Sequence, residues 1–229
     1  MRVSFLVPAF NESATIVDVL DAVAALDLEK QIVVVDDGST YETAEIAEAK
    51  GAFVVRQPNR GKGAAIRAAI PYAEGEISVI QDADLEYDPA DVPGLIEPIL
   101  HGHADVVFGS RLSGGRPQRA YLFWHLVGNR FLSLLTNVLF NTTLSDMETG
   151  YKAFRTDVLR SLDLREDSFG IEPEITGQIC KRNLRIYELP ISYYGRTYDE
   201  GKKIGWRDGI RAFYCIVRYS PVVRRVVGR

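Results

Sequence analysis

The clearest sign of chemistry in this 229-residue sequence is a pair of aspartates, Asp82 and Asp84, separated by one alanine. They follow the short run 77–80, which is typical of a buried strand. Two carboxylates so spaced can present oxygens to Mg²⁺ or Mn²⁺, which complete their shell with water and substrate phosphates. Aspartate is also common in turns, but the position after a strand favours a metal site. We therefore predict a metal site at Asp82 and Asp84, with Glu86 as a third ligand or a water-holding carboxylate.

A second acidic turn, Asp36-Asp37-Gly38-Ser39, ends the β-branched run 31–35. An acid at this place in an α/β sheet commonly accepts hydrogen bonds from a ribose or base. A dinucleotide-dependent dehydrogenase would also need Gly-x-Gly-x-x-Gly after the first strand, but residues 8–12 contain no glycine. Residues 61–63, Gly-Lys-Gly, lack the other residues of a Walker loop. The pattern therefore predicts a nucleotide site of another kind.

These turns follow strands that alternate with helices through the first hundred residues. Strands are expected at 4–9, 31–35, 53–55, 77–80 and, further on, 106–109, and helices at 11–24, 43–50 and 61–73. This alternation predicts an α/β fold with a mainly parallel central sheet and helices on both faces. Ligands of such sheets bind outside the carboxyl ends of the strands. The polar clusters at 8–12, 36–39 and 82–84 should therefore converge on one rim.

Length and composition fit one large α/β domain. Hydrophobic residues make up 46% and charged residues 25% of the chain, an ordinary globular balance. The first residues read as a strand rather than a signal peptide, and no run of about 18 apolar residues predicts a transmembrane helix. Cys180 and Cys215 have no metal-binding spacing and are expected to be buried thiols in a reducing compartment.

The net charge of −4 is unevenly distributed along the chain. Residues 1–100 carry 18 acids and 7 bases, whereas residues 176–229 carry 4 acids and 12 bases. A basic C-terminal quarter suits phosphate ligands or an anionic surface, although solvated basic faces would look the same.

The apolar segment 121–140 is either a core helix or a helix against lipid, and the segment 206–229 interleaves apolar residues with arginine.

Read in order, the motifs resemble a known family. They are Val7-Pro8-Ala9-Phe10-Asn11-Glu12, Val35-Asp36-Asp37-Gly38-Ser39, Asn59-Arg60-Gly61-Lys62-Gly63, Asp82-Ala83-Asp84, Gly109-Ser110-Arg111, Asp146-Met147-Glu148-Thr149-Gly150-Tyr151-Lys152 and Arg196-Thr197-Tyr198-Asp199-Glu200-Gly201-Lys202. Together they resemble the family 2 glycosyltransferases with the GT-A fold. The last three resemble the branch of dolichol-phosphate mannose synthase and bacterial polyprenyl-phosphate glycosyltransferases. The resemblance covers residues 3–210. It implies one GT-A nucleotide-diphospho-sugar transferase domain at 1–210 and a basic amphipathic, membrane-surface tail at 211–229.

The resemblance implies a role for each matching residue. The nucleotide would be bound by Pro8, Ala9, Phe10, Glu12, Val35, Asp37, Asp82 and Ala83. The metal would be held by Asp82, Asp84 and Glu86. Catalysis would involve Asp84 and the phosphate-holding bases Arg111, Arg196 and Lys202, and the acceptor region would contain Asp146 and Glu148. Two positions depart from the family: Phe10 replaces a common Tyr and lacks its hydroxyl, and Glu86 replaces a Gln frequent in mannose synthases.

The chemistry explains why cations are needed. A nucleoside diphosphate gains negative charge as the sugar bond breaks, and a metal with fixed Arg or Lys side chains stabilises that charge. A lipid monophosphate is mostly dianionic near neutral pH and needs no strong base. We therefore expect inverting transfer of a hexose, mannose or glucose, from GDP-mannose or UDP-glucose to dolichyl or undecaprenyl phosphate. The enzyme would act peripherally at the cytoplasmic face of a membrane, directly or through a membrane-anchoring partner, and would bind no nucleic acid.

Two alternatives remain open at this point. Family 2 enzymes that glycosylate saccharide hydroxyls use an acid near 146–174 as general base, and commonly carry a Gln-x-x-Arg-Trp motif that this chain lacks. A non-catalytic nucleotide-sugar-binding protein would bind the donor without releasing a nucleoside diphosphate. The sequence does not choose the base, the sugar, the lipid length, Mg²⁺ or Mn²⁺, or the oligomeric state.

Overall fold

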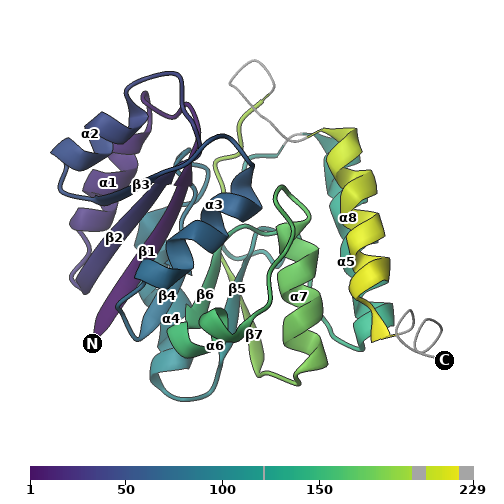
Figure 1. Cartoon of the computed structure of the whole chain (residues 1–229). Helices are drawn as coiled ribbons and strands as arrows, with labels where there is room; N and C mark the ends of the chain where they lie inside the picture. The colour runs from purple at the N-terminus through teal and green to yellow at the C-terminus, as the bar shows by residue number, and fades with distance from the viewer. Residues whose placement is uncertain (121, 198–204, 222–229) are drawn as a thin grey trace.

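A computed structural model describes residues 1–120, 122–197 and 205–221 (Figure 1). The strands are β1 (Arg2–Ala9), β2 (Glu29–Asp36), β3 (Phe53–Arg56), β4 (Ile77–Ile80), β5 (Val106–Ser110), β6 (Lys152–Arg155) and β7 (Ile186–Pro190). The α-helices are α1 (Ile16–Ala24), α2 (Thr43–Ala49), α3 (Lys62–Ala69), α4 (Val92–Leu100), α5 (Phe123–Phe140), α6 (Thr156–Ser161), α7 (Ile171–Lys181) and α8 (Trp206–Tyr219). The short 3₁₀ helices are η1 (Ile70–Tyr72) and η2 (Pro89–Asp91).

The strands form one seven-stranded sheet in the order β3-β2-β1-β4-β6-β5-β7. β1 pairs in parallel with β2 and β4, β2 with β3, and β5 with β7. β6 is antiparallel to both of its neighbours, and Lys152 at its start pairs with Ile80 at the end of β4. The predicted α/β fold with a mainly parallel sheet is confirmed. The insertion of β6 brings the turn before it, residues 146–151, to the rim where β4 ends.

Helices cover both faces of the sheet because successive strand residues point to opposite sides. On one face, Phe5 and Val7 of β1 join a core with Leu20 of α1. On the other face, Leu6 joins a core with Ile66 of α3 and residues of α6 and α7. Figure 1 shows α3, α6 and α7 in front of the sheet. The doubly covered sheet leaves its carboxyl-end rim as the place where loops can form a site.

Helices α5 and α8 lie side by side beyond α7 (Figure 1). Leu132 of α5 and Ile216 of α8 share a small core, and Ala212 and Cys215 are also buried. Our expected domain boundary at residue 210 falls inside α8, so residues 211–219 continue a helix packed on the body. Residues 222–229 of the expected tail lie outside the described residues. In the part of the chain that the structure describes, no helix combines the length and apolar character needed to span a bilayer.

Candidate active site

The loops at the carboxyl ends of the strands enclose one pocket of about 1420 Å³. The predicted site residues that line it are Pro8, Ala9, Phe10, Glu12, Asp37, Asp82, Ala83, Asp84, Glu86, Arg111, Glu148 and Arg196. Val35 is instead fully buried in the core with Leu6 and Val33, because alternation along β2 turns its side chain inward. Lys202 lies outside the described residues. The three polar clusters therefore meet at one rim, as predicted from the strand order.

The acidic pair is held by two cationic side chains. Lys62 Nζ donates to Asp82, at 2.7 Å from Oδ1, and Arg196 Nη2 donates to Asp84 Oδ2 at 2.8 Å. Burial, together with the nearby carboxylates of Asp82 and Glu86, raises the pKa of Asp84 to about 7. These crowded carboxylates fit a divalent cation, because a positive ion among them would remove their repulsion.

The expected three-carboxylate metal set is not assembled. Glu86 accepts hydrogen bonds from the Arg196 backbone N–H at 2.7 Å and from the Tyr193 hydroxyl at 3.0 Å. These bonds turn its oxygens toward the 193–196 segment. Among the described residues, no three His, Cys, Asp or Glu side chains are grouped to hold a metal ion. The structure thus leaves Asp82 and Asp84 as the candidate protein ligands and gives Glu86 the task of fixing the segment that carries Arg196.

Asp37 organises the loop that carries Lys62. Its carboxylate accepts hydrogen bonds from the backbone N–H groups of Arg60 at 3.0 Å and Gly61 at 2.7 Å. A Cβ at Gly63 would lie 2.2 Å from the Glu166 carbonyl oxygen, so no larger residue fits there without a shift of the backbone. The glycines of the 59–63 motif therefore allow close packing of two loops. Lys62 belongs to that motif, yet reasoning from the sequence assigned it no role in the site.

Arg111 is held rigidly by a buried aspartate. Arg111 Nε donates to Asp146 Oδ2 and Nη2 to Oδ1, each at 2.7 Å, and Asp146 is fully buried. The guanidinium group also lies 5.3 Å from the centre of the Tyr193 ring. Paired donors of this kind fix a guanidinium in one orientation. Asp146, expected in the acceptor region, thus lies behind the pocket and positions Arg111, which lines it.

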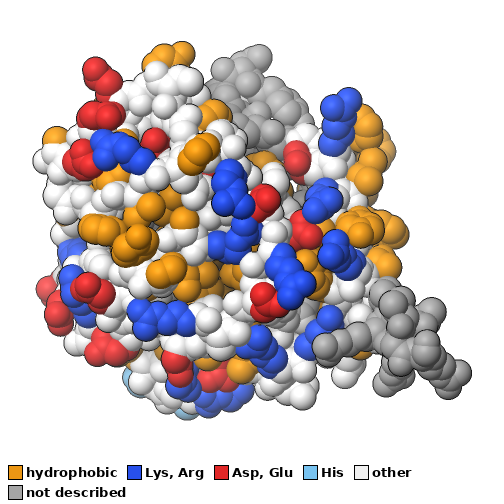
Figure 2. Space-filling model, in the orientation of Figure 1, with side chains coloured by type: hydrophobic (Ala, Val, Ile, Leu, Met, Phe, Trp, Pro, Cys, Tyr) orange, Lys and Arg blue, Asp and Glu red, His pale blue; other side chains and the backbone are white. Residues whose placement is uncertain are grey.

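The pocket continues from this charged end to an apolar wall made by α5 and α8. The wall includes Leu122, Phe123, Trp124, Leu126, Leu132 and Trp206. Large apolar side chains of the same helices are also exposed, with Trp124 78% and Trp206 72% accessible. Figure 2 shows hydrophobic side chains along the edge formed by α8, with lysine and arginine side chains beside them. The expectation of a core helix is therefore wrong for α5, because only Leu132, Ser133 and Thr136 of this helix are buried.

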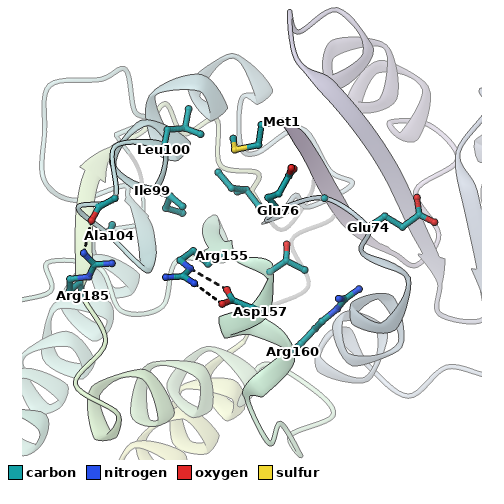
Figure 3. Close-up of a pocket in the computed structure, with 14 residues that line it drawn as sticks. Met1, Glu74, Glu76, Ile99, Leu100, Ala104, Arg155, Asp157, Arg160 and Arg185 are labelled. Atoms are coloured by element: carbon teal, nitrogen blue, oxygen red, sulfur yellow. Dashed lines mark hydrogen bonds and ion pairs between the residues drawn. The ribbon is translucent and has the colours of Figure 1, made fainter.

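A second pocket, of about 520 Å³, lies at the opposite end of the sheet (Figure 3). Its arginine side chains bond to neighbouring groups of the protein. Arg155 Nη2 donates to Asp157 Oδ2 at 2.6 Å, and Arg185 Nη2 donates to Asp105 Oδ1 at 2.7 Å. Arg160 donates to the carbonyl of Ala73. The Arg185–Asp105 pair joins the beginnings of β7 and β5, so this end has a structural role.

The chain belongs to glycosyl transferase family 2. The sequence profile of that family, described as "Glycosyl transferase family 2", matches residues 4–163, which is more than half of the chain. The match agrees with the motifs that suggested the family.

Named relatives and solved structures support the branch and the fold. Glycosyltransferase AglJ of Haloferax volcanii is 33% identical over 195 residues. The match covers 85% of this chain and 63% of AglJ, so the chain spans less than two thirds of that relative. Undecaprenyl-phosphate mannosyltransferase of Micrococcus luteus is 29% identical over 223 residues, 90% of this chain and 88% of the relative. A similar solved structure is that of glucosyl-3-phosphoglycerate synthase from Mycobacterium tuberculosis with Mn²⁺, UDP and glucosyl-3-phosphoglycerate. It matches with a TM-score of 0.75 and 25% sequence identity, and the match covers 95% of this chain and 79% of that chain. The predicted GT-A fold is therefore confirmed.

Proposed function

We propose that this protein is an inverting hexosyltransferase that moves mannose or glucose from a GDP- or UDP-sugar to a polyprenyl phosphate. One observation carries the proposal: a single pocket joins the acidic pair and two guanidinium groups to an apolar wall on α5 and α8. The charged end suits a nucleoside diphosphate, and the apolar end suits an isoprenoid chain. The name of the Micrococcus luteus relative, which refers to undecaprenyl phosphate, supports the same acceptor class.

The donor would lie with its diphosphate at Asp82 and Asp84. Mg²⁺ or Mn²⁺ held by these two carboxylates would offset the charge of the departing diphosphate. Lys62 and Arg196, which contact the same carboxylates, would exchange these partners for phosphate oxygens. Forked guanidinium donors match phosphate oxygens in geometry as well as in charge. The structure of the Mycobacterium tuberculosis enzyme with Mg²⁺ and UDP supports this choice of ion and ligand.

The acceptor phosphate would lie beside Arg111, whose orientation is fixed by Asp146. One phosphate oxygen attacks the anomeric carbon as the bond from that carbon to the diphosphate oxygen breaks, so the configuration inverts. The acceptor is mostly dianionic near neutral pH, so the step requires no proton acceptor. Arg111 instead reduces the repulsion between the acceptor phosphate and the donor diphosphate. We propose that Lys202 adds further positive charge there.

Membrane association would be peripheral, at the cytoplasmic face. The exposed aromatic and aliphatic side chains of α5 and α8 would enter the interface, and Arg207 and Arg218 of α8 would contact anionic headgroups. In this proposal residues 1–210 form the catalytic unit, and residues 211–229 extend the membrane-facing surface. A separate membrane-anchoring protein would strengthen the attachment, since one amphipathic surface binds reversibly.

The test is a matrix of donors and acceptors. The full chain is incubated in detergent with GDP-mannose, UDP-glucose, GDP-glucose or UDP-mannose, a polyprenyl phosphate, and Mg²⁺ or Mn²⁺, and the lipid product is identified by mass. A polyprenyl-phosphate hexose is expected from one donor, and none in excess chelator. Product formed only on a saccharide hydroxyl, or donor binding without release of a nucleoside diphosphate, would overturn the proposal.

A further inference from the structure

Two buried carboxylate oxygens in the wall of the pocket have no hydrogen-bond partner among the described residues. They are Oε1 of Glu148 and Oε1 of Glu172. Both residues line the pocket, and Glu172 is only 3% exposed. Lys62 Nζ lies 3.8 Å from Glu172 Oε1, which is beyond hydrogen-bond distance. Burying a polar atom without a partner is costly, so these atoms point to a ligand that supplies donors.

The other oxygen of Glu172 is held by the protein. Lys152, which is fully buried, donates from Nζ to Glu172 Oε2 and to the carbonyl of Thr149. The same ammonium lies 4.7 Å from the centre of the Phe108 ring. These contacts fix the Glu172 side chain and leave Oε1 as its unused acceptor. Lys152 thus positions Glu172 at the pocket wall.

The location of Glu148 indicates which part of a ligand it would meet. A Cβ on Gly150, two residues along, would lie 2.6 Å from Lys62 Nζ and 2.9 Å from Asp82 Oδ2. The Glu148–Gly150 turn therefore abuts the pair at which the proposed donor diphosphate binds. The hexose of a nucleotide sugar is attached directly to that diphosphate, so its hydroxyl groups would lie within reach of this turn.

The chemistry of Glu148 suits hydroxyl groups. Burial, together with the neighbouring Glu172 carboxylate, raises the pKa of Glu148 to about 8. A sugar hydroxyl that donates to the unpartnered Oε1 would stabilise the ionised carboxylate, which is a stronger acceptor than the amide oxygen of a glutamine. Asp146 in the same motif does not share this property, because both of its oxygens are taken by Arg111.

We infer that Glu148 and Glu172, with Lys152 as a positioning residue, bind hydroxyl groups of the transferred hexose and determine which hexose is accepted. The inference rests on the proposed function, because it assigns the sugar of the same nucleotide-sugar donor. A site built to hydrogen-bond a hydroxyl rejects an analogue that lacks it, because its own buried groups are then left unpaired.

The main test compares binding of donor and of diphosphate alone. Calorimetry would measure the affinities of wild type and Glu148→Gln for GDP-mannose and GDP, and for UDP-glucose and UDP. Loss of a hydrogen bond to the sugar should weaken the nucleotide sugar about 10-fold and leave the nucleoside diphosphate within about twofold. Glu97→Gln, an exposed position on α4, is the matched control and should change neither. Equal losses for both ligands, or no loss for either, would overturn the inference.

A second measurement uses wild type and therefore does not depend on the folding of a variant. Donors lacking single hydroxyls at C2, C3, C4 or C6 should show a selective loss of kcat/KM at one or two positions, and Glu148→Gln should reduce that selectivity. Glu172→Gln should act in the same direction where its melting temperature shows that it folds. Uniform turnover of all deoxy donors would contradict the inference, as would a Glu148→Gln variant that loses kcat on a saccharide acceptor with donor affinity unchanged.

These outcomes separate the inference from the proposed function. Transfer to polyprenyl phosphate by wild type tests the reaction alone. Selective loss of nucleotide-sugar affinity tests the sugar site alone, since it is read without an acceptor. A wild type that transfers to lipid while Glu148→Gln binds GDP and GDP-mannose with unchanged affinities would leave the function in place and remove the sugar site.

Discussion

The two ends of the central sheet hold charged side chains in opposite states. At the carboxyl-end rim, burial and like charges raise the pKa of Asp84 to about 7 and that of Glu148 to about 8. At the amino end, hydrogen bonds from Arg185 lower the pKa of Asp105 to about 2. Charges at the amino end are matched within the protein and stabilise the fold. Charges at the rim are costly to the free protein, as expected where a ligand must complete the electrostatics.

The largest expected difference between the two ends comes from replacing one acid at each. Asp84→Asn should lower kcat by about 1000-fold, since in the proposed site it removes a metal ligand at the developing charge. Its melting temperature should stay equal or rise, because a crowded carboxylate is removed. Asp157→Asn at the amino end is the matched control and should retain turnover. Steady-state kinetics and thermal unfolding check both; full activity of Asp84→Asn, or in excess chelator, would contradict the proposed site.

The second prediction concerns Arg111 at the rim, where a substitution can keep the positive charge and change only the geometry. Arg111→Lys keeps the positive charge but loses the paired contact with Asp146. In the proposed mechanism the acceptor phosphate is then held less precisely. The kcat/KM for polyprenyl phosphate should fall about 100-fold, while the affinity for the nucleoside diphosphate should change little. Kinetics with varied acceptor and calorimetry with nucleotide measure the two effects. A larger effect on the nucleotide would place Arg111 at the donor instead.

The third prediction concerns membrane binding by the exposed apolar side chains of α5 and α8. Trp124→Ser combined with Trp206→Ser removes two exposed indoles, and binding to vesicles of mixed neutral and anionic lipid should weaken about 10-fold. Stability should change by less than about 0.5 kcal/mol, because both side chains are exposed. Vesicle sedimentation and thermal melting give the two values. Tyr41→Ser, an exposed aromatic in a loop near the nucleotide end, is the control that should bind vesicles like wild type.

Substitutions at the amino end of the sheet should change the free energy of unfolding and leave turnover unchanged. Asp105 has a folded pKa below its ordinary value, so its pairing with Arg185 stabilises the fold above the ordinary pKa near 4, and this contribution disappears as the pH falls through about 2. Asp105→Asn should cost about 1 kcal/mol at neutral pH, since the Arg185 side chain is half exposed. It should also flatten the acid dependence of unfolding. Urea titrations between pH 2 and 7 measure this, and a loss of turnover without a loss of stability would contradict the structural role.

The sequence alone determined the layered fold and the position of its rim. Alternation of β-branched runs with helical segments is a local property, and it requires parallel strands whose carboxyl ends meet. For that reason the order of the strands is enough to place residues 8–12, 36–39 and 82–84 together. The apolar segment 121–140 is also recognisable as a helix, since its spacing of apolar side chains is local.

Only the tertiary structure decided what individual side chains at the rim do. The antiparallel β6 between β4 and β5 depends on long-range pairing, and it brings Asp146 behind Arg111 and Glu148 into the pocket wall. Glu172 reaches the same wall from α7, which no local pattern connects to Asp82. Whether a carboxylate is paired, as in Asp146, or left with an unused oxygen, as in Glu148, depends on neighbours that are distant in the chain.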